Sequence, residues 1–210
     1  VPWGGGIRAP EHHSEANEAI FTNVPGLRVV MPSSPQRAYG LLLAAIRDPD
    51  PVIFFEPKRI YRQYKEEVVD DGEALPLDVC FVLREGADVT LVTWGSQVKE
   101  ALEAADALAQ DGISAEVIDV ATVKPLDFDT IHESVKKTGR CVIVHEAPRT
   151  AGFGAEIAAQ LAEKAMFDLV APVERVTGYD THIPLFRLEM KYLPSVDKIV
   201  AAAKRTLAVS

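Results

Sequence analysis

Two adjacent histidines near the start of the chain, His12 and His13, are the first residues whose type and position suggest chemistry. They follow a loop that contains Gly4–Gly6 and precede a segment with the carboxylates Glu15 and Glu18. These side chains could bind a metal, transfer a proton near neutral pH, or mark the start of a helix. Their spacing matches neither a zinc-peptidase helix nor a structural zinc pattern, which favours a helix start over a metal site. Proton transfer stays open on these residues alone.

If the histidines only precede a helix, Ser14 is the expected N-cap of the segment EANEAIF. The carboxylates of Glu15 and Glu18 would then favour the positive end of that helix.

Two stretches farther along the chain are weaker candidates. The segment AGFGAEI, residues 151–157, is similar to a dinucleotide-binding loop, but its third glycine is missing and seven residues separate it from the preceding strand. A closely packed helix start is the favoured interpretation. His145 and Glu146 end an apolar run, where parallel sheets often bind ligands. Polar residues that leave the core at the surface are the favoured alternative.

Two turns complete the set of candidate sites. Trp94, Gly95 and Ser96 follow another strand-like run, and we interpret them as a turn and a helix cap. The segment AIRDPDP, residues 45–51, ends a predicted helix in a tight turn. Such a turn can direct several backbone carbonyls at a hard cation, or it can simply separate two elements. Both interpretations remain open.

The composition of the 210 residues is that of a globular protein, with 48% hydrophobic residues and a formal net charge of −9. That charge argues against a nucleic-acid-binding surface, and no apolar run is long enough for a membrane span. Cys80 and Cys141 lie in strand-like runs and are expected to be buried and unpaired in a reducing cytosol. The start lacks an initiator Met and a signal-peptide pattern, so we expect further residues upstream of Val1.

Hydrophobic periodicity predicts an α/β fold on both sides of a polar, acidic linker at residues 64–76. Before it, strands at 27–32 and 51–56 flank a helix at 34–48, which is one complete crossover unit. After it, apolar strands alternate with helices, which predicts a parallel sheet covered on both faces. The predicted strands are 79–86, 88–95, 115–120, 141–146 and 173–179, and the helices are 96–112, 127–139, 152–167 and a last one from Ser195.

Five segments together resemble the beta chain of the thiamine-diphosphate-dependent 2-oxo acid dehydrogenases, the decarboxylating component of large multienzyme complexes. They are HHSEANEAIFTNVPGLRVVMPSSP, AIRDPDPVIFFEPKRIYR, AEVIDVATVKPLD, KTGRCVIVHEAPRTAGFGAEI and VTGYDTHIP. The resemblance covers nearly the whole chain, in order, and only the later part of such a beta chain. Transketolase-type thiamine enzymes are an alternative, against which the block EPKRIYR argues.

This resemblance implies two domains and an activity. Residues 1–72 would form the C-terminal part of a pyrimidine-binding domain, and residues 73–210 a transketolase C-terminal-type domain with a mainly parallel sheet. The expected activity is oxidative decarboxylation of a 2-oxo acid with reductive acylation of a lipoyl group. The blocks FFEPKRIYR and GYDT are more similar to branched-chain than to pyruvate enzymes, and a pyruvate dehydrogenase beta subunit is the alternative.

The resemblance also implies site residues. His13 matches the family histidine beside the reacting carbon of thiamine diphosphate, while Glu15 replaces a usual glutamine. Four backbone carbonyls of the Asp-Pro-Asp-Pro turn would hold a structural potassium ion, those of Ala45, Ile46, Asp48 and Asp50. Magnesium and the diphosphate would be held mainly by the alpha chain, and the activating glutamate would lie upstream, so no cofactor-binding residue is assigned here.

The partners implied are an alpha chain, a second beta chain and the dihydrolipoyl acyltransferase core. Neither nucleic acid nor a membrane is an expected partner. A bacterial or archaeal cytoplasm is favoured over the mitochondrial matrix. These 210 residues alone are expected to be inactive. A non-catalytic role in dimerisation and in docking to the acyltransferase core is the alternative from another functional class.

Overall fold

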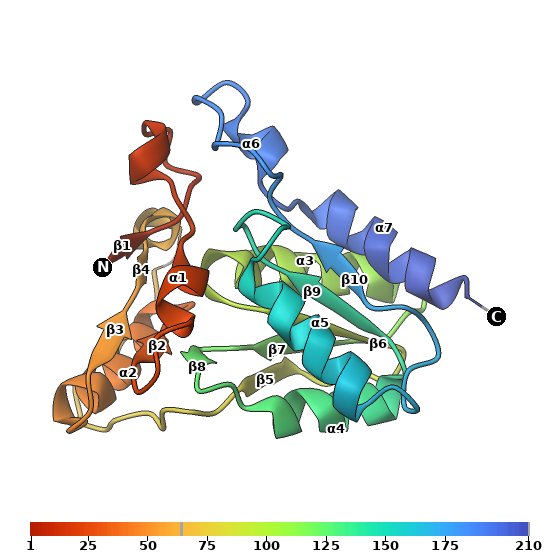
Figure 1. The fold of residues 1–210 in the computed structure, drawn as a ribbon, viewed down its shortest axis with the longest axis horizontal. Helices are drawn as coiled ribbons and strands as arrows, with labels where there is room; N and C mark the ends of the chain where they lie inside the picture. Colours follow the sequence, from red (N-terminus) through yellow and green to blue (C-terminus); the bar gives the residue numbers. More distant parts are fainter. Residues whose placement is uncertain (64, 210) are drawn as a thin grey trace.

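The computed structural model describes residues 1–63 and 65–209 and confirms the predicted α/β fold. Figure 1 shows the N-terminal part of the chain, in red and orange, beside a larger C-terminal part in green to blue. The two termini lie at opposite ends of the longest axis.

A five-stranded sheet forms the centre of the C-terminal part, in the order β10-β9-β6-β7-β5. The four strands from β10 to β7 are parallel, which confirms the predicted mainly parallel sheet. At one edge β5 runs antiparallel to β7, because the short connection from β5 to β6 cannot form a parallel crossover. The strands are β5 (Phe81–Arg84), β6 (Val89–Thr93), β7 (Ala115–Asp119), β9 (Cys141–Val144) and β10 (Glu174–Val176).

Two helices cover each face of this sheet. α3 (Val98–Gln110) and α7 (Val196–Leu207) pack on one face, while α4 (Phe128–Thr138) and α5 (Phe153–Lys164) pack on the other. Side chains alternate along each strand, so Leu91 of β6 faces the first pair of helices and Val92 faces the second. The sheet is therefore apolar on both sides, as the continuous apolar runs predicted.

The N-terminal part is built around the predicted crossover unit. β2 (Arg28–Val30) and β3 (Val52–Phe54) are parallel and joined by α2 (Pro35–Arg47). Ser34 caps α2 by accepting a hydrogen bond from the amide of Arg37, and Pro35 occupies the first helical turn. A strand that the sequence did not predict, β8 (Thr122–Lys124), crosses from the C-terminal part and pairs antiparallel with β2.

Smaller elements complete the fold. The pair β1 (Pro2–Trp3) and β4 (Glu56–Pro57) is parallel and was also not predicted. The remaining elements are the 3-10 turns η1 (Glu11–His13), η2 (Lys58–Arg62) and η3 (Gly95–Gln97) and the short helices α1 (Glu18–Thr22) and α6 (Glu189–Tyr192).

Several local predictions can now be compared with the structure. The predicted linker begins at Tyr64, which lies outside the described residues, and residues 65–76 contain neither helix nor strand. Cys141 is buried and free, and burial raises the pKa of its thiol to about 12; Cys80 is free and half-buried. Across residues 1–63 and 65–209, no helix has the length and apolar character to cross a membrane.

Candidate functional site

The two histidines lie in η1, a turn that projects away from the sheets at the red end of the chain (Figure 1). Both imidazoles are exposed, and their ring centres are 4.2 Å apart. The amide of His13 donates to the carbonyl of Pro10, which closes the turn, and the Lys58 ammonium donates to the carbonyl of His13. His13 is thus presented on an anchored loop with its side chain accessible.

The predicted cap at Ser14 is wrong. Helix α1 begins at Glu18, and its N-cap is Asn17, whose side chain makes no capping hydrogen bond. Ser14 is buried, and its hydroxyl donates to the carbonyl of Ala9 at 3.3 Å. The physical reason is that the 3-10 turn at 11–13 intervenes before the helix, so the serine closes the base of the histidine loop instead.

The glycine-rich segment that leads into the histidine loop forms a cradle of amide groups. Positive φ angles at Gly4 (82°), Gly6 (84°) and Arg8 (61°) turn successive N–H groups toward the protein. The amides of Gly6 and Arg8 donate to the two carboxylate oxygens of Glu189, at 2.8 and 2.9 Å. Glu189 is buried at the start of α6, so the C-terminal domain holds this loop directly.

A second buried carboxylate, that of Glu146, holds the same segment from the end of β9. Its Oε1 accepts from the amide of Gly5 at 2.7 Å, and its Oε2 accepts from the Ser96 hydroxyl at 2.8 Å and from the Gln97 amide group at 3.3 Å. A Cβ at Gly4 would lie 2.3 Å from Oε1, so only glycine fits there. We refer to Glu146 and Glu189 together as the carboxylate clamp.

The clamp corrects two predictions. His145 and Glu146 do not leave the core at the surface, because their side chains are 0% and 1% exposed. The N-terminal segment covers the carboxyl end of β9 and takes the place of solvent. Ser96 does not cap α3, since the helix begins at Val98 after a 3-10 turn and the Ser96 hydroxyl is directed at Glu146.

A third buried carboxylate, Glu18, lies between two tryptophans. Trp3 donates its indole N–H to Oε2 at 2.8 Å, and Trp94, at the end of β6, donates to Oε1 at 3.2 Å. Burial raises the pKa of Glu18 from 4.5 to about 7, although both hydrogen bonds act to lower it. This carboxyl group therefore changes its charge near neutral pH while it joins the N-terminal part to the central sheet.

His145 is a buried histidine without a chemical partner. Its ring stacks on Trp94 at 5.2 Å and an interplanar angle of 10°, and neither ring nitrogen has a hydrogen-bond partner among the described residues. Burial lowers the pKa of His145 to about 3. A Cβ at Gly152 or Gly154 would lie 2.8 or 2.5 Å from the ring. The two glycines of AGFGAEI thus make room for this ring, which supports a closely packed helix start.

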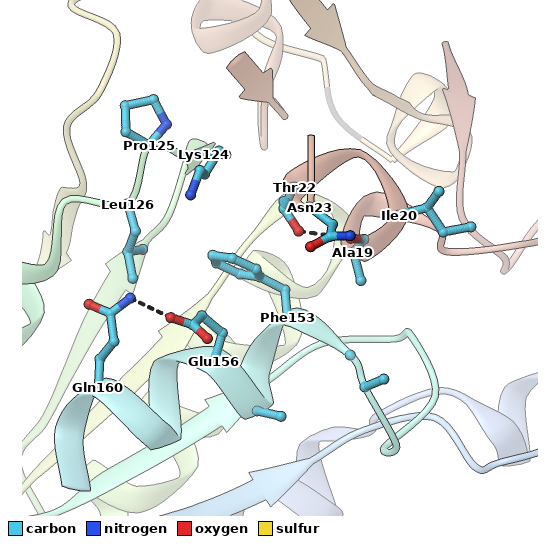
Figure 2. Close-up of a pocket in the computed structure, with 13 residues that line it drawn as sticks. Ala19, Ile20, Thr22, Asn23, Lys124, Pro125, Leu126, Phe153, Glu156 and Gln160 are labelled. Carbon is cyan, nitrogen blue, oxygen red and sulfur yellow. Dashed lines mark hydrogen bonds between the residues drawn. The ribbon is translucent and has the colours of Figure 1, made fainter. Parts of the chain in front are cut away.

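A groove begins beside the histidine loop. A cavity of about 330 Å³ is lined by the residues that directly follow His13 and by loops of the C-terminal domain. It shares four residues with a more open cavity of about 1040 Å³ between α1, the 124–126 turn and the start of α5 (Figure 2). Figure 2 shows Phe153 pointing into this second cavity between α1 and Leu126. The shared residues are Ala19, Ile20, Ala151 and Gly152.

The predicted potassium ligands lie elsewhere, at the end of α2. Ala45 and Ile46 are in its last turn, while Asp48 and Asp50 follow it. Arg28 donates to the carboxylates of Asp48 at 2.9 Å and of Asp50 at 3.0 Å, so these side chains are bound to a cation of the protein itself. Potassium binding by the four backbone carbonyls stays a prediction. Within the described part of the chain, no group of three or more His, Cys, Asp or Glu side chains is arranged to hold a metal.

The cradle of amides resembles the loops that bind phosphates, but it is already filled. Its N–H groups donate to Glu146 and Glu189, and a diphosphate would have to displace both buried carboxylates. The described residues therefore do not fit a diphosphate at Gly4–Gly6. They do fit a role beside a cofactor held elsewhere, because the imidazole of His13 is exposed and the residues that directly follow it line a cavity.

Sequence reasoning missed the residues that anchor this loop. The sequence singles out Glu146 at the end of an apolar run, gives no indication of Glu189, and places Glu18 only as an acidic residue at the start of a helix. The one available signal was the glycine run beside Trp3, since three consecutive glycines allow a close backbone approach. In the structure, the glycine backbone lies against two carboxylates of the protein itself.

Comparison with known families defines the class of protein. Residues 79–199 match the family described as "Transketolase, C-terminal domain", and residues 1–63 match "Transketolase, pyrimidine binding domain". The chain therefore belongs to the transketolase C-terminal domain family. A solved structure titled "Split gene transketolase, inactive beta4 tetramer" superposes with a TM-score of 0.82 and 28% identity, over 100% of this chain and 65% of that one.

Among sequence relatives, the similarity is to beta subunits of 2-oxo acid dehydrogenases, which confirms the resemblance. The chain is 49% identical over 205 residues to "Pyruvate dehydrogenase E1 component subunit beta" of Acholeplasma laidlawii, covering 98% of this chain and 63% of the relative. It is 48% identical over 207 residues to "2-oxoisovalerate dehydrogenase subunit beta 2, mitochondrial" of Arabidopsis thaliana, covering 99% and 58%. The chain thus spans less than two thirds of the length of these relatives.

Proposed function

We propose that this chain is the later part of a beta subunit in a thiamine-diphosphate-dependent 2-oxo acid dehydrogenase. The observation that supports the proposal most is the location of His13. By the sequence resemblance it matches the family histidine. Its imidazole is exposed, the residues that directly follow it line a cavity, and its loop is anchored to the C-terminal domain by the carboxylate clamp. An anchored, accessible imidazole is suited to proton transfer at neutral pH.

Thiamine diphosphate, when bound, supplies the electron sink on which a 2-oxo acid loses CO₂. The contribution of this chain is a proton, supplied by the His13 side chain. Transfer of the acyl group to a lipoyl disulfide breaks the S–S bond and leaves a thiolate, and the imidazolium of His13 donates the proton that this sulfur takes up. The cavity walls around residues 14–17 and 146–148 would exclude water from that step.

The cofactor is assigned mainly to other chains or residues. Because the Gly5 and Gly6 amides already donate to Glu146 and Glu189, we place the diphosphate and magnesium on an alpha chain. Potassium is proposed at the carbonyls of Ala45, Ile46, Asp48 and Asp50. A rise in the melting temperature in KCl relative to choline chloride at equal ionic strength would support that site, and identical melting in both salts would refute it.

The substrate proposal is a branched-chain 2-oxo acid, supported by the blocks FFEPKRIYR and GYDT. Pyruvate is the alternative, because relatives of both kinds are nearly equally similar, at 49% and 48% identity. Parallel assays on pyruvate and 3-methyl-2-oxobutanoate distinguish them. A higher kcat/KM for the branched-chain acid would support the proposal. A higher kcat/KM for pyruvate would show that the enzyme is of the pyruvate type instead.

The proposed partners are an alpha chain, a second beta chain and the acyltransferase core, in the cytoplasm of a bacterium or archaeon. A dimerisation and docking module without catalysis is a second candidate, favoured by the formal charge of −9, which suits a basic docking domain. If the assembled protein binds such a core but turns over no 2-oxo acid with an alpha chain, the second candidate replaces the first.

The deciding experiment compares two neighbouring histidines in the assembled enzyme. We expect His13→Ala to lower the rate of lipoyl acylation by about 10²- to 10⁴-fold, the usual contribution of a positioned acid or base. His12→Ala is the matched control, since His12 lies in the same turn and is exposed as well. It should retain acylation within about tenfold. Equal losses in both variants would mean that the loop, and not the His13 imidazole, matters.

A further inference from the structure

A separate pocket of about 380 Å³ lies at the edge of the central sheet, where β10 ends. Its walls come from Arg149 in the loop after β9, from β10 and the residues that follow it, and from α7. In parallel sheets, ligands bind in the crevice outside the carboxyl ends of the strands, and this pocket has that location. No residue of the histidine-loop cavities lines it.

Four cationic side chains line the pocket, and among the residues that the structure describes only one of them is paired with a carboxylate. Arg205 forms a bidentate ion pair with Glu174, at 3.1 and 2.9 Å. Arg149, Arg175 and Lys198 have no salt bridge to any carboxylate of the described residues.

Backbone carbonyls, rather than opposite charges, hold these three cations in place. Arg149 and Arg175 each donate to the main-chain carbonyl of the other, at 2.9 and 3.0 Å. The Lys198 ammonium donates to the carbonyls of Lys191 at 2.8 Å and Leu193 at 3.0 Å. Carbonyl dipoles orient a cation without neutralising it, so the charges remain available to a ligand.

The one carboxylate among the lining residues, Asp180, is engaged by its neighbour. It accepts from the amide and the hydroxyl of Thr150, at 2.8 and 2.7 Å. Three cations without a salt bridge and the single carboxylate of Asp180 leave the pocket lining with a formal excess of two positive charges. The net charge of the whole chain, in contrast, is −9. Burial and the neighbouring Arg149 lower the pKa of Arg175, while Asp180 acts to raise it. The two guanidinium groups therefore repel each other, and an anion between them would relieve that repulsion.

We propose that this pocket binds a phosphate group carried by a small organic molecule. A phosphate monoester bears a charge of about −1.5 to −2 at neutral pH, which matches the local excess. Two adjacent guanidinium groups suit planar, bidentate recognition of phosphate oxygens, and Lys198 adds a point charge. The cavity is within the size range of small-molecule sites, so it has space for an organic portion beside Tyr179 and Ala201.

The test titrates the full chain with inorganic phosphate at constant ionic strength, with the backbone amides of 177–180 followed by NMR. Constant ionic strength separates binding from general screening. Ala201→Glu is the informative variant, because Ala201 is exposed on the pocket wall and its replacement removes no hydrogen bond while it adds a competing carboxylate. Ala159→Glu adds the same charge to the exposed side of α5, outside the pocket, and is the matched control.

We expect saturable shifts at 177–180 in the wild type, an affinity about tenfold weaker in Ala201→Glu, and an unchanged affinity in Ala159→Glu. Tenfold corresponds to roughly 1.4 kcal/mol. Glycerol phosphate that binds more tightly than inorganic phosphate would indicate an organic ligand. Equal affinity for glycerol phosphate and inorganic phosphate would support a phosphate site whose ligand is the free anion, and would overturn the organic portion of the proposal. Shifts that do not saturate, or equal weakening by both variants, would overturn the proposal.

Discussion

The two faces of the five-stranded sheet are covered in contrasting ways. The face beneath α3 and α7 is sealed by small and branched apolar side chains, many of them alanines. The opposite face combines an apolar core with a buried hydroxyl cluster of Thr90, Ser134 and Thr138 beneath α4. At the carboxyl ends of its strands it leads to Trp94, whose ring stacks on His145. The second face thus also joins the N-terminal part of the chain, through the hydrogen bond from Trp94 to Glu18.

The first prediction concerns the sealed face and has the largest expected effect. Leu108→Ala should lower the free energy of unfolding by about 2–5 kcal/mol, because it leaves a cavity under a fully buried position of α3. Denaturant unfolding measures this loss. Leu102→Ala, at a half-buried position of the same helix, is the control and should have a smaller effect. Equal losses would mean that the two sides of α3 are packed alike.

Much of the sealed face could be predicted from sequence. Helical periodicity places Val98, Ala101, Leu102, Ala105 and Leu108 on one apolar stripe of the helix predicted at 96–112, and the structure buries four of these five side chains. Leu102, expected in the same stripe, is only half-buried. Periodicity succeeds here because contacts between a helix and the sheet depend on residues close together in sequence.

The carboxylate clamp could not be predicted in the same way. Gly5 and Glu146 are 141 positions apart, and Gly6 and Glu189 are 183 apart, so only the assembled topology brings them together. Propensity also misled at Ser14 and Ser96, both of which are typical cap residues. Each hydroxyl instead bonds to a partner in the site, Ala9 or Glu146. Tertiary hydrogen bonds overrode local preference where the site is built.

The second prediction concerns the glycine that adjoins His145. Gly154→Ala would place a Cβ 2.5 Å from Nε2 of His145, whose ring is fixed against Trp94. We expect a loss of about 1–3 kcal/mol in the free energy of unfolding, as for other overpacked cores. A double-mutant cycle with His145→Ala measures the coupling, because removal of the ring should make the alanine tolerable. Additive effects in the cycle would contradict the contact.

The third prediction separates positioning from stability. Glu189→Gln leaves one amide of the cradle facing an NH₂ group, so either Gly6 or Arg8 loses its acceptor. We expect a loss of about 1–3 kcal/mol in local stability, observed as faster hydrogen exchange at these amides while those of α3 and α7 keep their protection.

Under the proposed function, the same variant should also lower lipoyl acylation in the assembled enzyme, through displacement of His13. Glu163→Gln, at an exposed position of α5, is the matched control and should change neither the exchange nor the activity. Slower acylation with unchanged exchange at Gly6 and Arg8 would contradict a positioning role for Glu189.

The last prediction uses the pH dependence of Glu18. Its pKa in the folded protein is about 7 against an ordinary value of 4.5, so the folded state binds more protons than the unfolded chain between these pH values. Stability from this group is therefore complete below pH 4.5 and is lost as the pH rises through about 7, by roughly 3 kcal/mol. His145, whose pKa is lowered to about 3, acts in the opposite sense as the pH falls from 6.5.

Because both groups titrate over overlapping ranges, only a comparison of variants isolates Glu18. Glu18→Gln removes the titration but leaves one indole N–H facing an NH₂ group, which should reduce the free energy of unfolding by about 1–3 kcal/mol at pH 5. The deficit relative to wild type should then shrink and vanish by pH 8, since the wild type alone loses stability over that interval. Asp119 at the end of β7 also titrates in this range, because burial raises the pKa of its carboxyl group to about 6. Both His145 and Asp119 are common to the two proteins, so their contributions cancel in the difference. A deficit that stays constant from pH 5 to pH 8 would show that Glu18 is already ionised at pH 5. Trp3 and Trp94 would then donate to a carboxylate and not to a protonated carboxyl group.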